Sequence, residues 1–130
     1  MQAAADKTIT TAIVEDIRDI REGLATLINF TEGFACNGSY RSMEEAIPKI
    51  KGNVPDVLLS DIGLPGMNGI DGTRILKDLY PDMTVLMLTV YDDDERIFDA
   101  ICAGATGYLL KRTAPAKLLE NIREAVEGGA

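Results

Sequence analysis

An aspartate in an unusual place is the first residue of this sequence that could do chemistry. Asp61 directly follows the apolar run 57–60 and precedes a segment rich in glycine and proline. Burying a carboxylate is costly unless it is paired or bound to a metal, so this position needs a reason. Other apolar runs are each closed by a polar residue that could act with Asp61, and these residues are Glu15, Asp16, Thr89 and Lys111.

Together these groups suit a divalent cation and the transfer of a phosphoryl group. Three neighbouring carboxylates repel one another, and a bound cation relieves that repulsion. A small set of oxygen ligands that leaves room for water and phosphate favours Mg²⁺ over Ca²⁺. A carboxylate can attack phosphorus to form an aspartyl-phosphate, while a hydroxyl and an ammonium stabilise the charged phosphoryl oxygens.

Each residue also has an ordinary structural interpretation. Asp61 could form the turn that follows it, and Glu15 with Asp16 could cap the next helix. Thr89 could be a plain strand residue, and Lys111 a solvated charge. We favour the functional interpretation because suitable groups recur at the ends of several apolar runs.

Apolar patterns predict the elements that must hold these side chains. Runs rich in β-branched residues predict strands at 8–14, 34–40, 56–60, 83–89 and 107–110. Apolar residues at helical spacing predict helices over 17–28, 43–50, 70–79, 97–101 and 118–126. This alternation predicts an α/β fold: a three-layer, doubly wound, flavodoxin-like sheet of five parallel strands in the order 2-1-3-4-5, with five helices.

That strand order places the candidate residues along one edge of the sheet. Strands 1, 3, 4 and 5 are neighbours in it, and ligands bind beyond the carboxyl ends of such strands where the order reverses. We therefore expect a row that begins with the carboxylates, continues with the hydroxyl of Thr89 and ends with the ammonium of Lys111.

Composition limits the function classes. The chain has 130 residues, 46% hydrophobic and 26% charged, which suits one globular domain over residues 8–128. We expect residues 1–7 to be a disordered tail and residues 129–130 to begin a linker. The formal charge of −8 disfavours direct binding to nucleic acid. No apolar run approaches the ~20 residues of a membrane span, so we expect a cytoplasmic protein in which Cys36 and Cys102 are small buried residues.

Four motifs are similar to those of one protein family. IVED (13–16) and LLSDIGLPGMNGID (58–71) are followed by VLMLTVYDD (85–93) and AGATGYLLK (103–111). With these motifs the chain resembles, over about residues 8–128, the receiver domain of bacterial two-component response regulators. The last motif is most similar to the subfamily that carries a C-terminal helix-turn-helix DNA-binding domain.

The resemblance implies a role for each residue of the acidic group. Asp61 would accept a phosphoryl group from the phosphohistidine of a sensor histidine kinase. Asp16 would bind Mg²⁺ directly and Glu15 mainly through water. Gly63 would offer the metal its backbone carbonyl at a position where a side chain would obstruct. Helix 1, over residues 17–28, would dock the kinase.

The resemblance also implies a switch. Thr89 would swing toward the phosphoryl group and Lys111 would pair with it. Tyr108 would turn inward as Thr89 moves, unless it is a partly buried core tyrosine. The face formed by helix 4, strand 5 and helix 5 (residues 92–128) would then control an attached output domain or homodimerisation, through this face or through helices 1 and 5. DNA would be bound only through a domain outside this chain.

Three residues depart from the family pattern. Arg112 stands where a proline often follows the lysine, which leaves the conformation of the 111–112 peptide open. Val90 and Tyr91 are bulky residues after Thr89, and they would modulate access of a phosphodonor or water to the pocket.

Two other functions fit parts of the pattern. A phosphohydrolase can use a similar aspartate, threonine and lysine, but its nucleophile belongs on the first strand with a second aspartate two residues later. Here Asp61 lies on the third predicted strand, and Gly63 stands two residues after it. A pseudo-receiver that only binds partners should lack some of the key residues, and none is missing. We therefore expect a signalling switch rather than a conventional enzyme.

Overall fold

The structure is a computed structural model that describes residues 7–90 and 94–128. Strands and helices alternate along the described chain, close to the ranges that the sequence predicts. Their order is β1 (Ile9–Val14), α1 (Arg18–Asn29), β2 (Phe34–Tyr40), α2 (Met43–Ile50), β3 (Val57–Asp61), α3 (Gly69–Leu79), β4 (Thr84–Thr89), α4 (Asp94–Cys102), β5 (Gly107–Leu110) and α5 (Pro115–Glu127).

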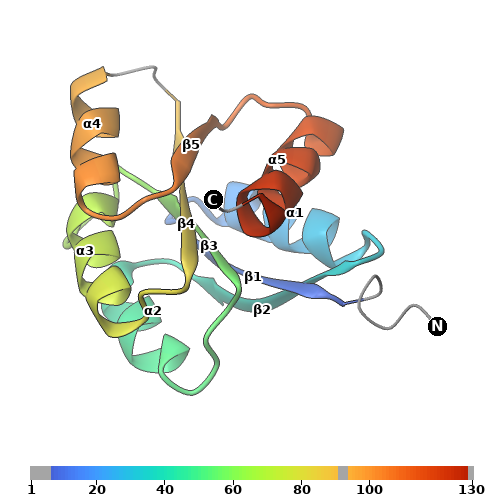
Figure 1. Ribbon diagram of the computed structural model, residues 1–130, viewed down its shortest axis with the longest axis horizontal. Coiled ribbons are helices and arrows are strands. Elements are labelled where there is room, and N and C mark those ends of the chain that lie inside the picture. The colour runs from blue at the N-terminus through green and yellow to red at the C-terminus, as the bar shows by residue number, and fades with distance from the viewer. Residues whose placement is uncertain (1–6, 91–93, 129–130) are drawn as a thin grey trace.

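The strands form one parallel sheet in the order β2-β1-β3-β4-β5. Helices α2, α3 and α4 cover one face of this sheet, and α1 and α5 cover the other (Figure 1). The predicted three-layer α/β fold and its strand order are therefore confirmed. The order reverses between β1 and β3, so the carboxyl ends of these two strands lie side by side.

The alternation of side chains along the strands gives the sheet two separate cores. Ala12 and Val14 of β1 pack toward α2, α3 and α4, whereas Ile9 and Ile13 pack toward α1 and α5. Full burial of a large aliphatic side chain stabilises the fold by roughly 1.5–3 kcal/mol relative to exposure. Because both faces are covered, the central residues of β3 and β4 are apolar, and the polar residues of these two strands lie toward their ends.

The edge strand β2 carries one extra residue. Thr11 pairs with Cys36, but the next residue of β1 pairs with Gly38, so Asn37 bulges out of the ladder. A Cβ at position 38 would overlap the ring of Tyr40, which explains the glycine there. Tyr40 lies opposite the last residue of β1, and its carbonyl accepts the N–H of Glu15 at 2.9 Å.

Two expectations about local structure are wrong. Helix α1 begins at Arg18, and Ile17 is its extended, half-exposed N-cap residue rather than a helical residue. The two cysteines are not buried: Cys36 is partly exposed on the edge strand β2, and Cys102 is exposed at the end of α4. Side chains on an edge strand or at the last residue of a helix have fewer neighbours to bury them than the spacing of apolar residues suggested.

Several sequence expectations concern the ends and loops of the chain. Residues 1–6 and 129–130, which include most of the expected tail and the expected linker, lie outside the described residues, as does Tyr91. No described peptide bond is cis, and the bond between residues 111 and 112 is trans. None of the described helices combines the length and apolar character needed to cross a membrane.

Candidate functional site

Three carboxylates converge at the reversal point of the sheet. One oxygen atom from each of Glu15, Asp16 and Asp61 lies within 4.8 Å of the other two. The convergence follows from the register, because Val14 pairs with Ser60 and the next residue of each strand therefore projects beyond the same edge. The group of carboxylates thus lies where the strand order predicted it.

Lys111 does not occupy the far end of a row. Its Nζ lies 2.7 Å from Oε1 of Glu15 and 3.3 Å from Oδ2 of Asp61. The backbone N–H of Lys111 donates to the carbonyl of Thr89 at 2.9 Å, so its Cα stays beside β4 while its side chain crosses the strand ends. The predicted linear order is therefore wrong, because the ammonium of Lys111 lies against the first carboxylate of the row rather than at its far end.

Glu15 is fully buried, and its surroundings shift its ionisation. Burial raises the pKa of Glu15 above its ordinary value, and the pairing with Lys111 offsets this only in part. Burial also disfavours the ammonium of Lys111, but its contacts with Glu15 and Asp61 outweigh this and raise the pKa of Lys111. A buried carboxylate that is hard to ionise will gain from any additional cation.

Asp61 both forms the turn that follows it and belongs to the group of carboxylates. Its Oδ1 accepts the N–H of Gly63 at 3.3 Å, so it does form the turn after β3. The residue is 8% exposed, and its other carboxylate oxygen faces Lys111. A Cβ at position 63 would meet no protein atom within 4 Å, so packing against the described residues does not itself require a glycine there.

Gly69 holds α3 against the backbone of Asp61, a contact that the residue types of the sequence did not predict. A Cβ at position 69 would overlap the carbonyl oxygen of Asp61, which also accepts the Ser60 hydroxyl at 3.0 Å. Asn68 caps the helix by accepting the N–H of Asp71 at 2.8 Å. A glycine directly after a capping residue, where most residues are tolerated, is the sequence signal that could have revealed this contact.

The residues expected to switch lie at the ends of β4 and β5. Thr89 is the last residue of β4 and is buried, at 8% exposure. The side chain of Val90 is mostly exposed, as expected for a residue at the mouth of the site. Tyr108 pairs with Met87 in the ladder and is 39% exposed, so it lies outward rather than in the core.

The acidic group fits a hard divalent cation. Its donors are all oxygen atoms, and Asp16 is exposed, so solvent can reach the group. The buried Oε1 of Glu15 faces the ammonium of Lys111 at 2.7 Å, and the described residues offer it no other hydrogen-bond partner. A buried oxygen that is incompletely satisfied, beside two further carboxylates, is the donor set that Mg²⁺ prefers with water as remaining ligand.

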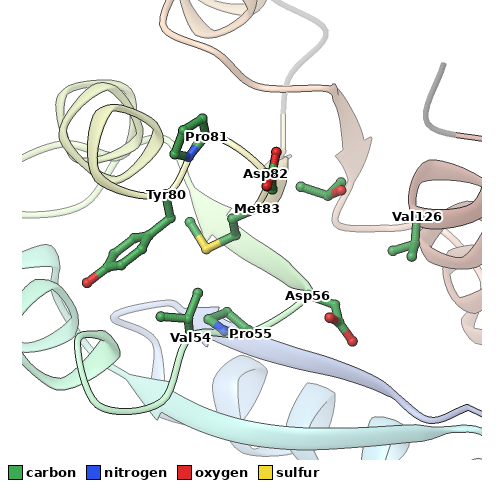
Figure 2. Close-up of a pocket in the computed structure, with 9 residues that line it drawn as sticks. Val54, Pro55, Asp56, Tyr80, Pro81, Asp82, Met83 and Val126 are labelled. Carbon is green, nitrogen blue, oxygen red and sulfur yellow. The ribbon is translucent and has the colours of Figure 1, made fainter.

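Two concave regions lie at opposite ends of the strands. A cavity of about 430 Å³ lies at the amino ends of β3 and β4, where Val54 and Pro55 face the segment from Tyr80 to Met83 (Figure 2). It is remote from the carboxylates, which follow the carboxyl ends. A second hollow, of about 400 Å³, borders the loop after Asp61 and is lined by Ile62, Gly63, Leu64, Asn68, Ile70, Arg96 and Asp99.

Comparisons with known proteins identify the family of this chain. Residues 11–123 match the family described as the response regulator receiver domain. Transcriptional regulatory protein DegU of Brevibacillus brevis is 33% identical over 125 residues, which are 96% of this chain and 53% of that protein. Transcriptional regulatory protein LnrK of Bacillus subtilis (strain 168) is 37% identical over 118 residues, covering 90% and 54%.

A solved structure shows the same relationship. The crystal structure of a two-component response regulator of the LuxR family from Aurantimonas sp. SI85-9A1 has a TM-score of 0.87 and 30% sequence identity, and the match covers 94% of this chain and 87% of that one. The chain spans about half the length of the curated relatives that it matches.

Proposed function

Because the chain belongs to the response regulator receiver domain family, as its motifs predicted, we propose that it is a phosphorylation-activated signalling switch. Asp61 accepts a phosphoryl group from the phosphohistidine of a sensor histidine kinase. The observation that carries this proposal is the convergence of Asp61 with Glu15, Asp16 and Lys111 at one edge of the sheet. An acidic group with one ammonium can hold a cation and a phosphoryl group together.

The transfer is a displacement at phosphorus. A carboxylate oxygen of Asp61 forms a P–O bond as the P–N bond to the donor imidazole breaks, and the released imidazole nitrogen takes up a proton. The turn to Gly63 and the contact with Lys111 hold both carboxylate oxygens of Asp61 in place. Lys111 then pairs with the charge on the phosphoryl oxygens.

The metal has a defined set of ligands in this proposal. Asp16 and Asp61 would hold Mg²⁺ directly, Glu15 would do so mainly through water, and Gly63 would contribute its carbonyl oxygen. When bound, Mg²⁺ neutralises negative charge on the phosphoryl group. When the ammonium of Lys111 turns to the phosphoryl group, Glu15 loses its main counter-charge. A cation held by the acidic group would supply that charge instead.

Phosphorylation changes the site by adding roughly two negative charges. The hydroxyl of Thr89 and the ammonium of Lys111 close in on the new charge, and Tyr108 turns inward from its exposed position. A few kcal/mol of differential interaction is enough to change the dominant state. The face of α4, β5 and α5 then alters, where Phe98, Ile101 and Tyr108 already expose apolar surface.

The altered face has two uses in this proposal. It forms a homodimer, through α4, β5 and α5 or through α1 and α5, or it controls an output domain in the whole protein. Relatives named as transcriptional regulatory proteins support an output that binds DNA through a domain outside this chain. Val90 and Tyr91, beyond Thr89, modulate the access of phosphodonor and water.

The rival functions fit less well. A phosphohydrolase would place its nucleophile on the first strand, but Asp61 ends β3, and the relatives are regulatory proteins. A pseudo-receiver would lack members of the acidic group or the lysine, and all of them are present at this edge of the sheet.

Intact mass spectrometry after incubation with acetyl phosphate and Mg²⁺ tests the proposal. We expect one phosphoryl adduct on the wild-type chain, its loss when EDTA replaces Mg²⁺, and no adduct on Asp61→Asn. An unmodified wild-type chain, with acetyl phosphate and with a panel of sensor kinases, would contradict it. Many turnovers on phosphomonoesters would favour the phosphohydrolase instead.

A further inference from the structure

Arg21 reaches from α1 to the backbone that carries two of the carboxylates. Its Nη1 donates to the carbonyl of Glu15 at 2.8 Å and lies 3.4 Å from the carbonyl of Asp16. Side chains of a helix point back toward its amino end, which brings this guanidinium over the loop between β1 and α1. Neighbouring Arg18 differs, because it forms an exposed pair with Glu22 at 3.2 Å.

Apart from the contacts with Arg21, Glu15 and Asp16 differ in how many hydrogen bonds hold them. Glu15 donates its N–H to Tyr40, accepts the N–H of Ile17 at 3.1 Å and pairs with Lys111. Asp16 is exposed, and among the described residues its only hydrogen bond is the one from Arg21. Within residues 7–90 and 94–128, Arg21 therefore makes the one hydrogen-bond contact to the backbone of Asp16.

The contacts of Arg21 are not those of a surface ion pair. Within the described part of the chain, no carboxylate oxygen lies within 4.0 Å of its guanidinium, although acidic residues surround it in the sequence. Both of the hydrogen-bond acceptors of its guanidinium within the described residues are carbonyl oxygens of the loop. Such contacts fix direction and leave the carboxylates of Glu15 and Asp16 free to face the same point.

We propose that Arg21 is a positioning residue of the cation site: its guanidinium holds the carbonyls of Glu15 and Asp16 and thereby aims the Asp16 carboxylate at the point where the three carboxylates converge. The inference rests on the proposed function in one respect, the binding of a divalent cation by Asp16. Groups that orient metal ligands typically contribute about 10–100-fold to metal affinity.

The charge of Arg21 and its hydrogen bonds should affect the binding of Mg²⁺ in opposite directions. Removing a cation near an acidic group should strengthen the binding of another cation by simple electrostatics. Removing a positioning residue should weaken it. Loss of Arg21 therefore weakens Mg²⁺ binding only if its hydrogen bonds matter more than its charge.

The test compares Arg21→Met with Arg18→Met by calorimetric titration with Mg²⁺. Methionine keeps an aliphatic stem and removes the donors, and the Arg18 variant loses the same charge three residues away. We expect Arg21→Met to bind Mg²⁺ about tenfold more weakly than the wild-type chain. We expect Arg18→Met to match the wild-type chain or bind slightly more tightly, and Arg21→Lys, with a single ammonium, to fall between.

Several outcomes decide the matter. Mg²⁺ binding by Arg21→Met that equals or exceeds that of Arg18→Met overturns the inference. Circular dichroism and thermal unfolding in EDTA establish whether Arg21→Met is folded. If it is not, Arg21→Lys decides, and wild-type affinity of that variant overturns the inference. The Asp61 adduct is scored separately, so a wild-type chain that binds Mg²⁺ but takes no phosphoryl group removes the proposed function and leaves this comparison valid.

Discussion

The ammonium of Lys111 lies 2.7 Å from Oε1 of Glu15, although β3 and β4 separate the strands that precede these two residues. The lysine therefore neutralises the most buried carboxylate of the group as well as Asp61, which lies 3.3 Å away. A bound cation and this ammonium would compete to neutralise the same carboxylates. Removing the lysine should affect metal binding and phosphorylation in opposite directions.

Replacing Lys111 with methionine should strengthen Mg²⁺ binding. At an effective dielectric constant of about 20, two unit charges about 4 Å apart interact by roughly 4 kcal/mol. A tenfold change in Mg²⁺ affinity needs only about 1.4 kcal/mol, a fraction of this repulsion. We expect at least about tenfold tighter Mg²⁺ binding by calorimetric titration, together with slower formation of the acetyl phosphate adduct. Lys117→Met, which removes an exposed lysine paired with Glu120, is the matched control. Unchanged or weaker Mg²⁺ binding by the Lys111 variant contradicts the competition.

Neutralising Glu15 should stabilise the metal-free chain. Its pKa is raised by burial, so ionisation is harder in the folded than in the unfolded chain. Stability from this group is therefore lost as the pH rises from its ordinary value of 4.5 through its higher value in the folded chain. In urea unfolding with EDTA, we expect Glu15→Gln to be more stable than the wild-type chain at about pH 8, by an amount that shrinks toward acid.

A second glutamate provides a control of opposite sign. The pKa of Glu45 is lowered, chiefly because its carboxylate accepts the N–H of Arg41. This stabilisation is present above the pKa of the unfolded chain and is lost as the pH falls. Glu45→Gln should therefore be less stable than the wild-type chain at about pH 8 and equal to it in acid. Parallel behaviour of the two variants would contradict the role assigned to burial of Glu15.

Adding one methyl group at Gly69 should disturb both the fold and the site. A Cβ there would overlap the Asp61 carbonyl oxygen and lie 3.0 Å from Cε of Met87, so the first turn of α3 must move. Overpacking of this kind costs about 1–3 kcal/mol, measurable by urea unfolding, and should also slow formation of the Asp61 adduct. Gly23→Ala lies within α1 in open space and should instead gain about 0.5–1 kcal/mol. Equal effects of the two alanines would refute this account of Gly69.

The sequence determined the elements well because its signals agreed at each level. Nearly continuous apolar runs indicated strands buried on both faces, and segments with helical spacing alternated with them along the chain. Once the strand order followed from the topology rules, the convergence of Glu15, Asp16 and Asp61 needed only the direction of the strands.

The predictions that were wrong concern how far a side chain extends and how deeply it is buried. Strand spacing alone could not show that Lys111 extends across its neighbours to Glu15. Periodicity could not show that Cys102 lies on the outer side of α4, since the pattern of a short helix leaves its last turn undetermined. The contacts of Arg21 and Gly69 depend on backbone atoms, which the residue types of a sequence do not reveal.

The bulge in β2 has a consequence for how the chain tolerates changes in length. The bulge accommodates one extra residue of β2 between two fixed pairs, Phe34 opposite Ile9 and Tyr40 opposite Val14. An insertion or deletion at Asn37 would alter the twist of the edge strand and leave Tyr40 in place. The carbonyl that receives the N–H of Glu15 is thus insulated from length variation at the other end of the strand.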